Sequence, residues 1–90
     1  MIGEYDPNKD ALNLKQHKLS LAFGSSIFED ENHLIIPSIR HEDGEERFKV
    51  VGIVDDKMFT GVFTWRHDVP RFISVRRSNK GETRAYHTEI

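Results

Sequence analysis

The sequence predicts a small α+β domain, with an antiparallel sheet of three to four strands, two N-terminal helices and a C-terminal helix. Helix signals occur only towards the two ends of the chain. Between them lie three consecutive stretches rich in β-branched and aromatic residues, at 47–54, 58–65 and 71–77. Short polar turns join these stretches, as in consecutive hairpins, so the strands should pair antiparallel and the helices should cover one face.

Start signals predict the two N-terminal helices. Asp6 can cap a helix that has Pro7 at its first position and that ends near residue 15 or 17. A short strand could precede it, at 1–5. Ser20 can cap a second helix, because apolar residues follow at helical spacing as far as Phe28.

The remaining segments complete the expected order of elements. Segment 29–46 is acidic and contains Pro37; its 33–36 part could form a fourth strand, and the rest is expected to be loop. Asp55 and Asp56 form an expected turn, and 66–70 forms another. Residues 80–87 suit a short helix, although Gly81 within it disfavours helix formation by about 1 kcal/mol relative to alanine.

Composition limits the classes of function. A chain of 90 residues is expected to form one domain, covering 1–90. Without cysteine it can form neither a disulfide nor a thiolate metal site. The five histidines lack zinc-like spacing, so no metal or other cofactor is expected. No run approaches the roughly 18 apolar residues of a membrane span, and no signal peptide is recognisable, so a cytoplasmic location is expected.

Charge is unevenly distributed along the chain. The net charge of −2 counts against nucleic-acid binding. However, segment 29–46 has seven acidic residues and one basic residue, whereas 65–90 has six basic and three acidic residues. The C-terminal third could therefore present a local positive surface, or it could simply be a solvated charged face.

Two groups of polar residues could carry chemistry. Lys9, Asn13 and His17 are four residues apart, which on a helix gives a stripe that drifts by about 40° per step. This stripe is expected to face away from the core, either as an ordinary solvated face or as a cationic wall with a titratable histidine. Glu46 beside Arg47 could combine a base with a charge stabiliser, or could be an ordinary surface ion pair.

Adjacent arginines close the last expected strand. Because neighbouring strand residues point to opposite faces, Arg76 and Arg77 should be separated by the sheet. Ile73 and Val75 are expected to face the helices together with Arg77. Phe72 and Ser74 are expected to share an open groove with Arg76, where an arginine could make a bidentate contact to phosphate.

Four stretches follow one another along nearly the whole chain: Tyr5-Asp6-Pro7-x-Lys9 with Asn13, His17 and Ile27-Phe28; Glu45-Glu46-Arg47-Phe48 with Val51-Gly52; Val62-Phe63-Thr64-x-Arg66; and Ile73-Ser74-x-Arg76-Arg77 with Glu82 and Tyr86. This ordered set resembles the BrnT family of bacterial toxins. The resemblance implies a fold similar to RelE-type ribonuclease toxins and RNA cleavage that inhibits translation. It also implies a BrnA-like antitoxin with a ribbon-helix-helix domain that represses the shared operon, with two toxins on one antitoxin dimer.

Metal-free RNA cleavage needs a base for the ribose 2′-OH, a charge stabiliser at the phosphate and an acid for the leaving 5′-oxygen. It would give a 2′,3′-cyclic phosphate. Glu46 or His17 could be the base and His17 the acid, and the choice between them stays open. The catalytic candidates are His17, Glu46, Arg76, Arg47 and Lys9. The RNA- or phosphate-binding candidates are Asn13, Arg77, Tyr86 and Arg66.

Two alternatives remain open at this point: an inert module that binds the antitoxin as a co-repressor, and a metal-dependent nuclease. For either form of the toxin, the basic segment 65–90 is expected to attract an acidic segment of the antitoxin. Exposed Phe72 or Tyr86 would then serve as aromatic anchors.

Overall fold

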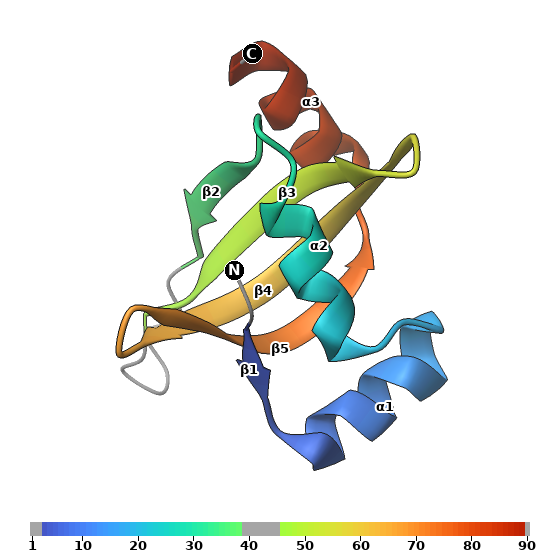
Figure 1. The fold of residues 1–90 in the computed structure, drawn as a ribbon. Helices are drawn as coiled ribbons and strands as arrows, with labels where there is room; N and C mark the ends of the chain where they lie inside the picture. Colours follow the sequence, from blue (N-terminus) through green and yellow to red (C-terminus); the bar gives the residue numbers. More distant parts are fainter. Residues whose placement is uncertain (1–2, 39–45, 90) are drawn as a thin grey trace.

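The computed structural model describes residues 3–38 and 46–89, and it confirms an α+β fold. In these residues five strands form one mixed sheet, in the order β1-β5-β4-β3-β2 (Figure 1). The strands are β1 (Glu4–Tyr5), β2 (Leu34–Pro37), β3 (Phe48–Val54), β4 (Lys57–Arg66) and β5 (Val69–Arg77). The expectation of three to four antiparallel strands is corrected, because β1 adds a fifth strand parallel to β5. A short strand at 1–5 was expected, but two residues carry no pattern that predicts the partner or the direction of pairing.

The predicted capping residues mark the starts of the N-terminal helical segments, but the second expected helix is divided into a 3₁₀ turn and a short α-helix. Asp6 accepts a hydrogen bond from the Asn8 N–H at 2.9 Å and caps α1 (Pro7–His17). Lys18 ends this helix in a left-handed conformation, with φ of 62°. Ser20 caps a 3₁₀ turn, η1 (Leu21–Phe23), which leads into the short α2 (Gly24–Phe28). None of the described helices is long and apolar enough to cross a membrane.

The C-terminal helix, α3 (Lys80–Glu89), starts at a reciprocal capping box. Asn79 Oδ1 accepts from the Glu82 N–H at 2.8 Å, and Glu82 Oε1 accepts from the Asn79 N–H at 3.0 Å. In Figure 1, α1 and α3 lie at opposite ends of the molecule, while α2 crosses in front of the sheet.

Two compact turns join the three long strands, as predicted. Asp55 and Asp56 both have positive φ, and so do His67 and Asp68. Two consecutive residues of this kind are typical of tight hairpins whose twist matches that of the strands. The second turn is therefore shorter than the expected 66–70.

The main core lies between one face of the sheet and the segment η1–α2. Its buried members are Leu21, Ile27, Val50, Phe59, Phe63, Phe72 and Val75.

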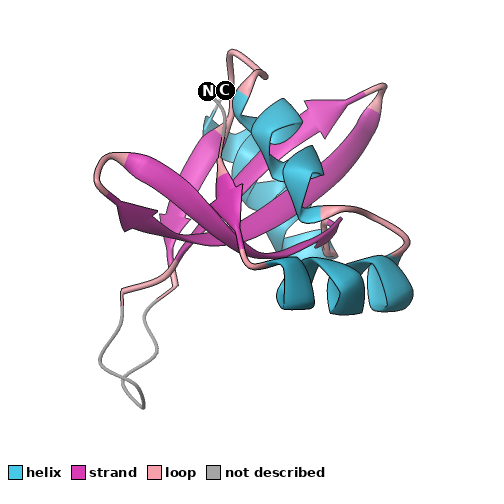
Figure 2. Ribbon diagram, turned by 60° about the horizontal axis from the view of Figure 1, so that its bottom comes forward, coloured by secondary structure: helices cyan, strands magenta, loops and turns pink. Residues whose placement is uncertain are grey.

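Val50 and Val51 are neighbours in β3, yet both are fully buried. Since adjacent strand residues point to opposite faces, both faces are covered here. The second cover is α3, whose Glu82 accepts a hydrogen bond from Thr60, the β4 partner of Val51. The expectation of one covered face is thus wrong, and Figure 2 shows helices around the twisted sheet.

A bulge in β5 changes which residues reach the core. Val62 lies opposite Ser74, but Phe63 lies opposite Phe72, so Ile73 is an extra residue. Phe72 therefore points into the core and is 1% exposed, whereas Ile73 lies beside Ser74 on the opposite face. The predicted sides of Ile73 and Phe72 are both wrong for this reason.

The predicted orientation of α1 is also wrong. Asn13 is buried, whereas Leu12 and Leu14 are 59% and 51% exposed. β1 pairs with β5 only as far as Phe72, and α1 lies beside β5 farther along. There Asn13 accepts a hydrogen bond from the Val75 N–H at 3.0 Å and donates to the Val75 carbonyl at 2.8 Å. A side-chain amide has the donor and acceptor of a peptide group, so Asn13 completes the strand edge.

Candidate functional site

Two adjoining hollows lie on the face of the sheet opposite the main core. The strand pocket has a volume of about 350 Å³ and is lined by Ser38, Arg47, Lys49, Val62, Ile73, Ser74 and Arg76. The helix pocket has a volume of about 230 Å³ and is lined by Lys9, Leu12, Asn13, Gln16, Ile73 and Ser74. Because Ile73 and Ser74 line both, the two hollows form one groove running from α1 across β5 to β3.

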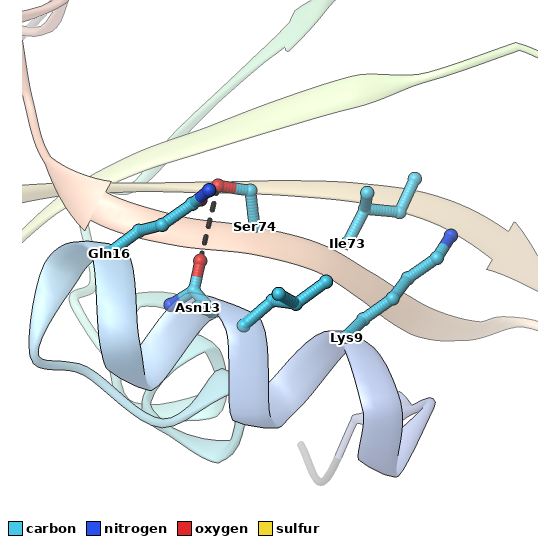
Figure 3. A pocket seen from close by; sticks show the side chains of 6 residues that line it. Lys9, Asn13, Gln16, Ile73 and Ser74 are labelled. Carbon is cyan, nitrogen blue, oxygen red and sulfur yellow. Dashed lines mark hydrogen bonds between the residues drawn. The ribbon is translucent and has the colours of Figure 1, made fainter.

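Strand alternation and register place the basic residues in this groove. Arg47 directly precedes β3 and Lys49 is the second residue of that strand; the two are two residues apart and line the same pocket. Lys49 lies opposite Val62, Val62 lies opposite Ser74, and Arg76 follows two residues later. Lys9 reaches the same groove from α1 (Figure 3). The described lining residues thus include four cations and no carboxylate, although the whole chain is net acidic.

A buried carboxylate at one end of the groove holds two of these cations. Glu82 is 5% exposed and binds both terminal nitrogens of Arg76, with each N–O distance 2.8 Å. Its Oε2 also lies 3.1 Å from Lys49 Nζ. This bidentate pairing fixes the plane of the Arg76 guanidinium. Arg76 and Lys49 remain 26% and 30% exposed, so a bound anion can still reach them.

Proton affinities follow from these contacts. Burial by itself would raise the pKa of Glu82, but hydrogen bonds from Arg76, the Asn79 N–H, Lys49 and Thr60 lower that pKa to about 2. Hydrogen bonding to Glu82 in turn raises the pKa of Arg76. Glu82 is therefore ionised at neutral pH and is a poor proton acceptor, which makes it a positioning group and not a base.

The groove brings together four of the residues predicted from sequence: Lys9, Asn13, Arg47 and Arg76. Asn13 forms part of the wall, but its amide is already used by Leu19, Ser74 and Val75.

Other predicted residues lie elsewhere. His17 and Glu46 are exposed and line neither pocket, and Arg66 is exposed at the end of β4. Arg77 is on the core side of the sheet, as the alternation predicts. It donates to the Met58 carbonyl at 3.2 Å, and its guanidinium lies 5.4 Å from the centre of the Phe59 ring.

Tyr86 is 2% exposed and donates to Asp30 Oδ2 at 2.7 Å, which links α3 to the turn that follows α2. Burial and the neighbouring Asp30 carboxylate raise the pKa of Tyr86 to about 12. The expectation of an exposed aromatic anchor at Phe72 or Tyr86 is therefore wrong, and Tyr86 offers no surface on which a base could stack.

Sequence reasoning missed four polar members of this site: Gln16, Ser38, Lys49 and Glu82. Two signals could have found the last two. Lys49 is two residues after Arg47 in an expected strand, which places both on one face. Asn79 and Glu82 have the spacing of a capping box, which marks the helix start. Glu45, the first residue of the motif Glu45-Glu46-Arg47-Phe48, lies outside the described residues.

Comparison with known proteins gives one result. The family described as "Ribonuclease toxin, BrnT, of type II toxin-antitoxin system" matches residues 5–82 of the 90-residue chain, a range that includes every residue lining the groove. Comparison with curated proteins gives no match. Within residues 3–38 and 46–89, no three His, Asp or Glu side chains come together as metal ligands.

Proposed function

Because the chain belongs to the BrnT family of ribonuclease toxins from type II toxin–antitoxin systems, we propose that its groove binds and cleaves RNA. The observation that carries this proposal is the convergence of Lys9, Arg47, Lys49 and Arg76 on one concave face. Phosphate contacts from such residues dominate the affinity of proteins for nucleic acids. Since the rest of the chain is net acidic, the groove is where RNA would be attracted.

The strand pocket is the proposed position of the scissile phosphate. Arg76, held by Glu82, and Arg47 would stabilise the charge that develops on the phosphate oxygens, and Lys49 would add to this field. Proton transfer is assigned to a smaller set. Glu46, directly before Arg47, and His17, at the end of α1, remain proposed candidates from outside the lining. Lys9, which lines the helix pocket, would add positive charge near the phosphate.

We propose that cleavage needs no metal ion and yields a 2′,3′-cyclic phosphate. A lining of four cations disfavours a divalent metal by charge repulsion. The ribose 2′-OH would then be the nucleophile. Cleavage of RNA in the cytoplasm would inhibit translation. A structural relationship to RelE-type toxins belongs to the same proposal and rests on the family.

Membership of a type II system implies a protein antitoxin. We propose a BrnA-like antitoxin with a ribbon-helix-helix domain, with two toxins on one antitoxin dimer and operator DNA contacted only through the antitoxin. An acidic segment of that partner would be attracted to the groove that binds RNA, so inhibition would be direct.

The test compares two adjacent arginines in an RNA cleavage assay, with and without EDTA. We expect Arg76→Ala to lower the cleavage rate by about 10²–10³ and Arg77→Ala to leave it nearly unchanged, because Arg77 is on the other side of the sheet. Thermal unfolding of both variants checks that they are folded. Equal losses would contradict the assigned groove, and loss of activity in EDTA would contradict metal independence. A folded wild-type protein that binds the antitoxin but cleaves no RNA would instead be an inert co-repressor.

A further inference from the structure

We propose that the helix pocket is a nucleobase subsite, which takes the base of a nucleotide next to the phosphate in the strand pocket. This inference rests on the proposed RNA-binding function and specifies which part of the RNA the second hollow recognises.

Continuity and size support a single base as the occupant. The two pockets share Ile73 and Ser74, so a chain whose phosphate lies among Arg47, Lys49 and Arg76 can extend directly into the helix pocket. A volume of about 230 Å³ is below the roughly 300–1,000 Å³ of pockets for drug-sized ligands. The hollow therefore suits one flat ring system, whereas the four cations of the groove suit the backbone.

The walls of the helix pocket have the chemistry that a base requires. Leu12 on α1 and Ile73 on β5 provide apolar surface for the faces of the ring. Leu12 is 59% exposed, so this surface is in contact with water until a ligand covers it. Single-stranded RNA is recognised through unstacked bases, whose faces lie against side chains and whose edges form hydrogen bonds; here the side chains against the face would be aliphatic.

Two polar side chains are available to read the edge of the base. Figure 3 shows Lys9 and Gln16 extending from α1 towards β5 on either side of Asn13. Among the described residues, neither the Gln16 amide nor the Lys9 ammonium has an internal partner. The Asn13 amide, in contrast, makes four hydrogen bonds inside the protein. Gln16 can both donate and accept, so it can distinguish one base edge from another.

The bulge at Ile73 explains why this hollow exists. In a regular strand, Ile73 would point to the core with Val75; as the extra residue of β5, it instead contributes an apolar wall beside Ser74. Asn13 holds α1 at the edge of the same strand through Val75. The two walls are therefore fixed before RNA binds.

The chain offers a matched pair of leucines for the test. Leu12 and Leu14 are on the same helix with similar exposure, 59% and 51%, but only Leu12 lines the pocket. Binding is measured by fluorescence anisotropy with labelled RNA heptamers whose 2′-oxygens are methylated to prevent cleavage. One heptamer is complete, and each of the others lacks the base at one position.

We expect wild-type protein to lose affinity about five- to tenfold when the base is missing at one particular position, as for a partly buried apolar group. The Leu12→Ala variant should bind the complete heptamer about five- to tenfold more weakly than wild type does. Removing the base at that position should no longer change the affinity of this variant. Leu14→Ala should behave like wild type. Gln16→Ala should reduce discrimination among the four bases at that position, while Arg76→Ala should weaken every heptamer alike.

Different results separate the two proposals. If wild type binds the heptamers through Arg76 but Leu12→Ala keeps the wild-type response to missing bases, the subsite is refuted and RNA binding stands. If Leu12→Ala weakens binding of the antitoxin and leaves RNA binding unchanged, the pocket holds a protein side chain, which also refutes the subsite. If wild type binds none of the heptamers, the RNA-binding function and the subsite are both refuted.

Discussion

Replacing Glu82 with glutamine removes one negative charge at the point where α3 meets β3, β4 and β5. The carboxylate accepts hydrogen bonds from Arg76, Lys49, Thr60 and the Asn79 N–H. Glutamine has nearly the same size and can still accept a hydrogen bond. It cannot neutralise the two cations, so the variant isolates the contribution of charge from that of shape.

The magnitude follows from the proton affinity of the folded state. The pKa of Glu82 falls from its ordinary value of 4.5 to about 2, and each unit corresponds to about 1.36 kcal/mol, so ionisation favours folding by roughly 3 kcal/mol. Because Arg76 and Lys49 are about a quarter to a third exposed, water partly replaces the lost charge. We therefore expect Glu82→Gln to lower the free energy of unfolding by about 2–3 kcal/mol at pH 7.

The sign of the pH dependence is opposite to that of a group whose pKa rises on folding. A depressed carboxyl pKa stabilises the folded protein fully above about pH 4.5, and this contribution disappears as the pH falls towards about 2. The difference between wild type and Glu82→Gln should accordingly shrink to less than half its neutral value near pH 3.

Urea unfolding followed by circular dichroism at several pH values measures this difference. Glu4→Gln is the control, because Glu4 is 51% exposed and lies 3.9 Å from Arg71, so its loss should cost less than about 0.5 kcal/mol. A Glu82→Gln variant as stable as wild type at pH 7 would refute the reasoning. So would a difference that stays constant from pH 7 to pH 3.

Two further predictions concern packing and use the same unfolding assay at pH 7. Asn13→Ala leaves the buried Val75 peptide group unpaired and should cost about 2–4 kcal/mol; a loss below about 0.5 kcal/mol, typical of exposed sites, would contradict the edge-completing role. Gly24→Ala would place a Cβ 2.4 Å from the Phe72 ring and should destabilise by about 1–3 kcal/mol. Gly81→Ala, whose Cβ would have its nearest neighbour at 3.5 Å, should instead stabilise by up to about 1 kcal/mol. Equal effects of the two alanines would contradict the close packing at Gly24.

Local signals in the sequence were sufficient to predict the helix starts, the tight turns and the three long strands. Asp6 and Ser20 cap the backbone two residues ahead, and Asp55 and Asp56 adopt their turn conformations from their own backbone preferences. These contacts involve residues close together in the chain, so their pattern is visible without knowledge of the fold. The ordered motifs likewise identified the family, and the alternation in β5 separated Arg76 from Arg77 correctly.

The orientation of side chains depended on contacts between segments distant in the chain. The side on which Ile73 and Phe72 lie is set by a register shift against β4, and no feature of 71–77 read alone reveals that shift. Asn13 is buried while Leu12 is exposed because an unpaired strand edge, 62 residues away at Val75, needs a donor and an acceptor. The cations of the groove come from α1, from β3 and the residue before it, and from β5. The chemistry of each residue is a local property, but whether a polar group is buried, paired or open to a ligand depends on which partner the fold places beside it.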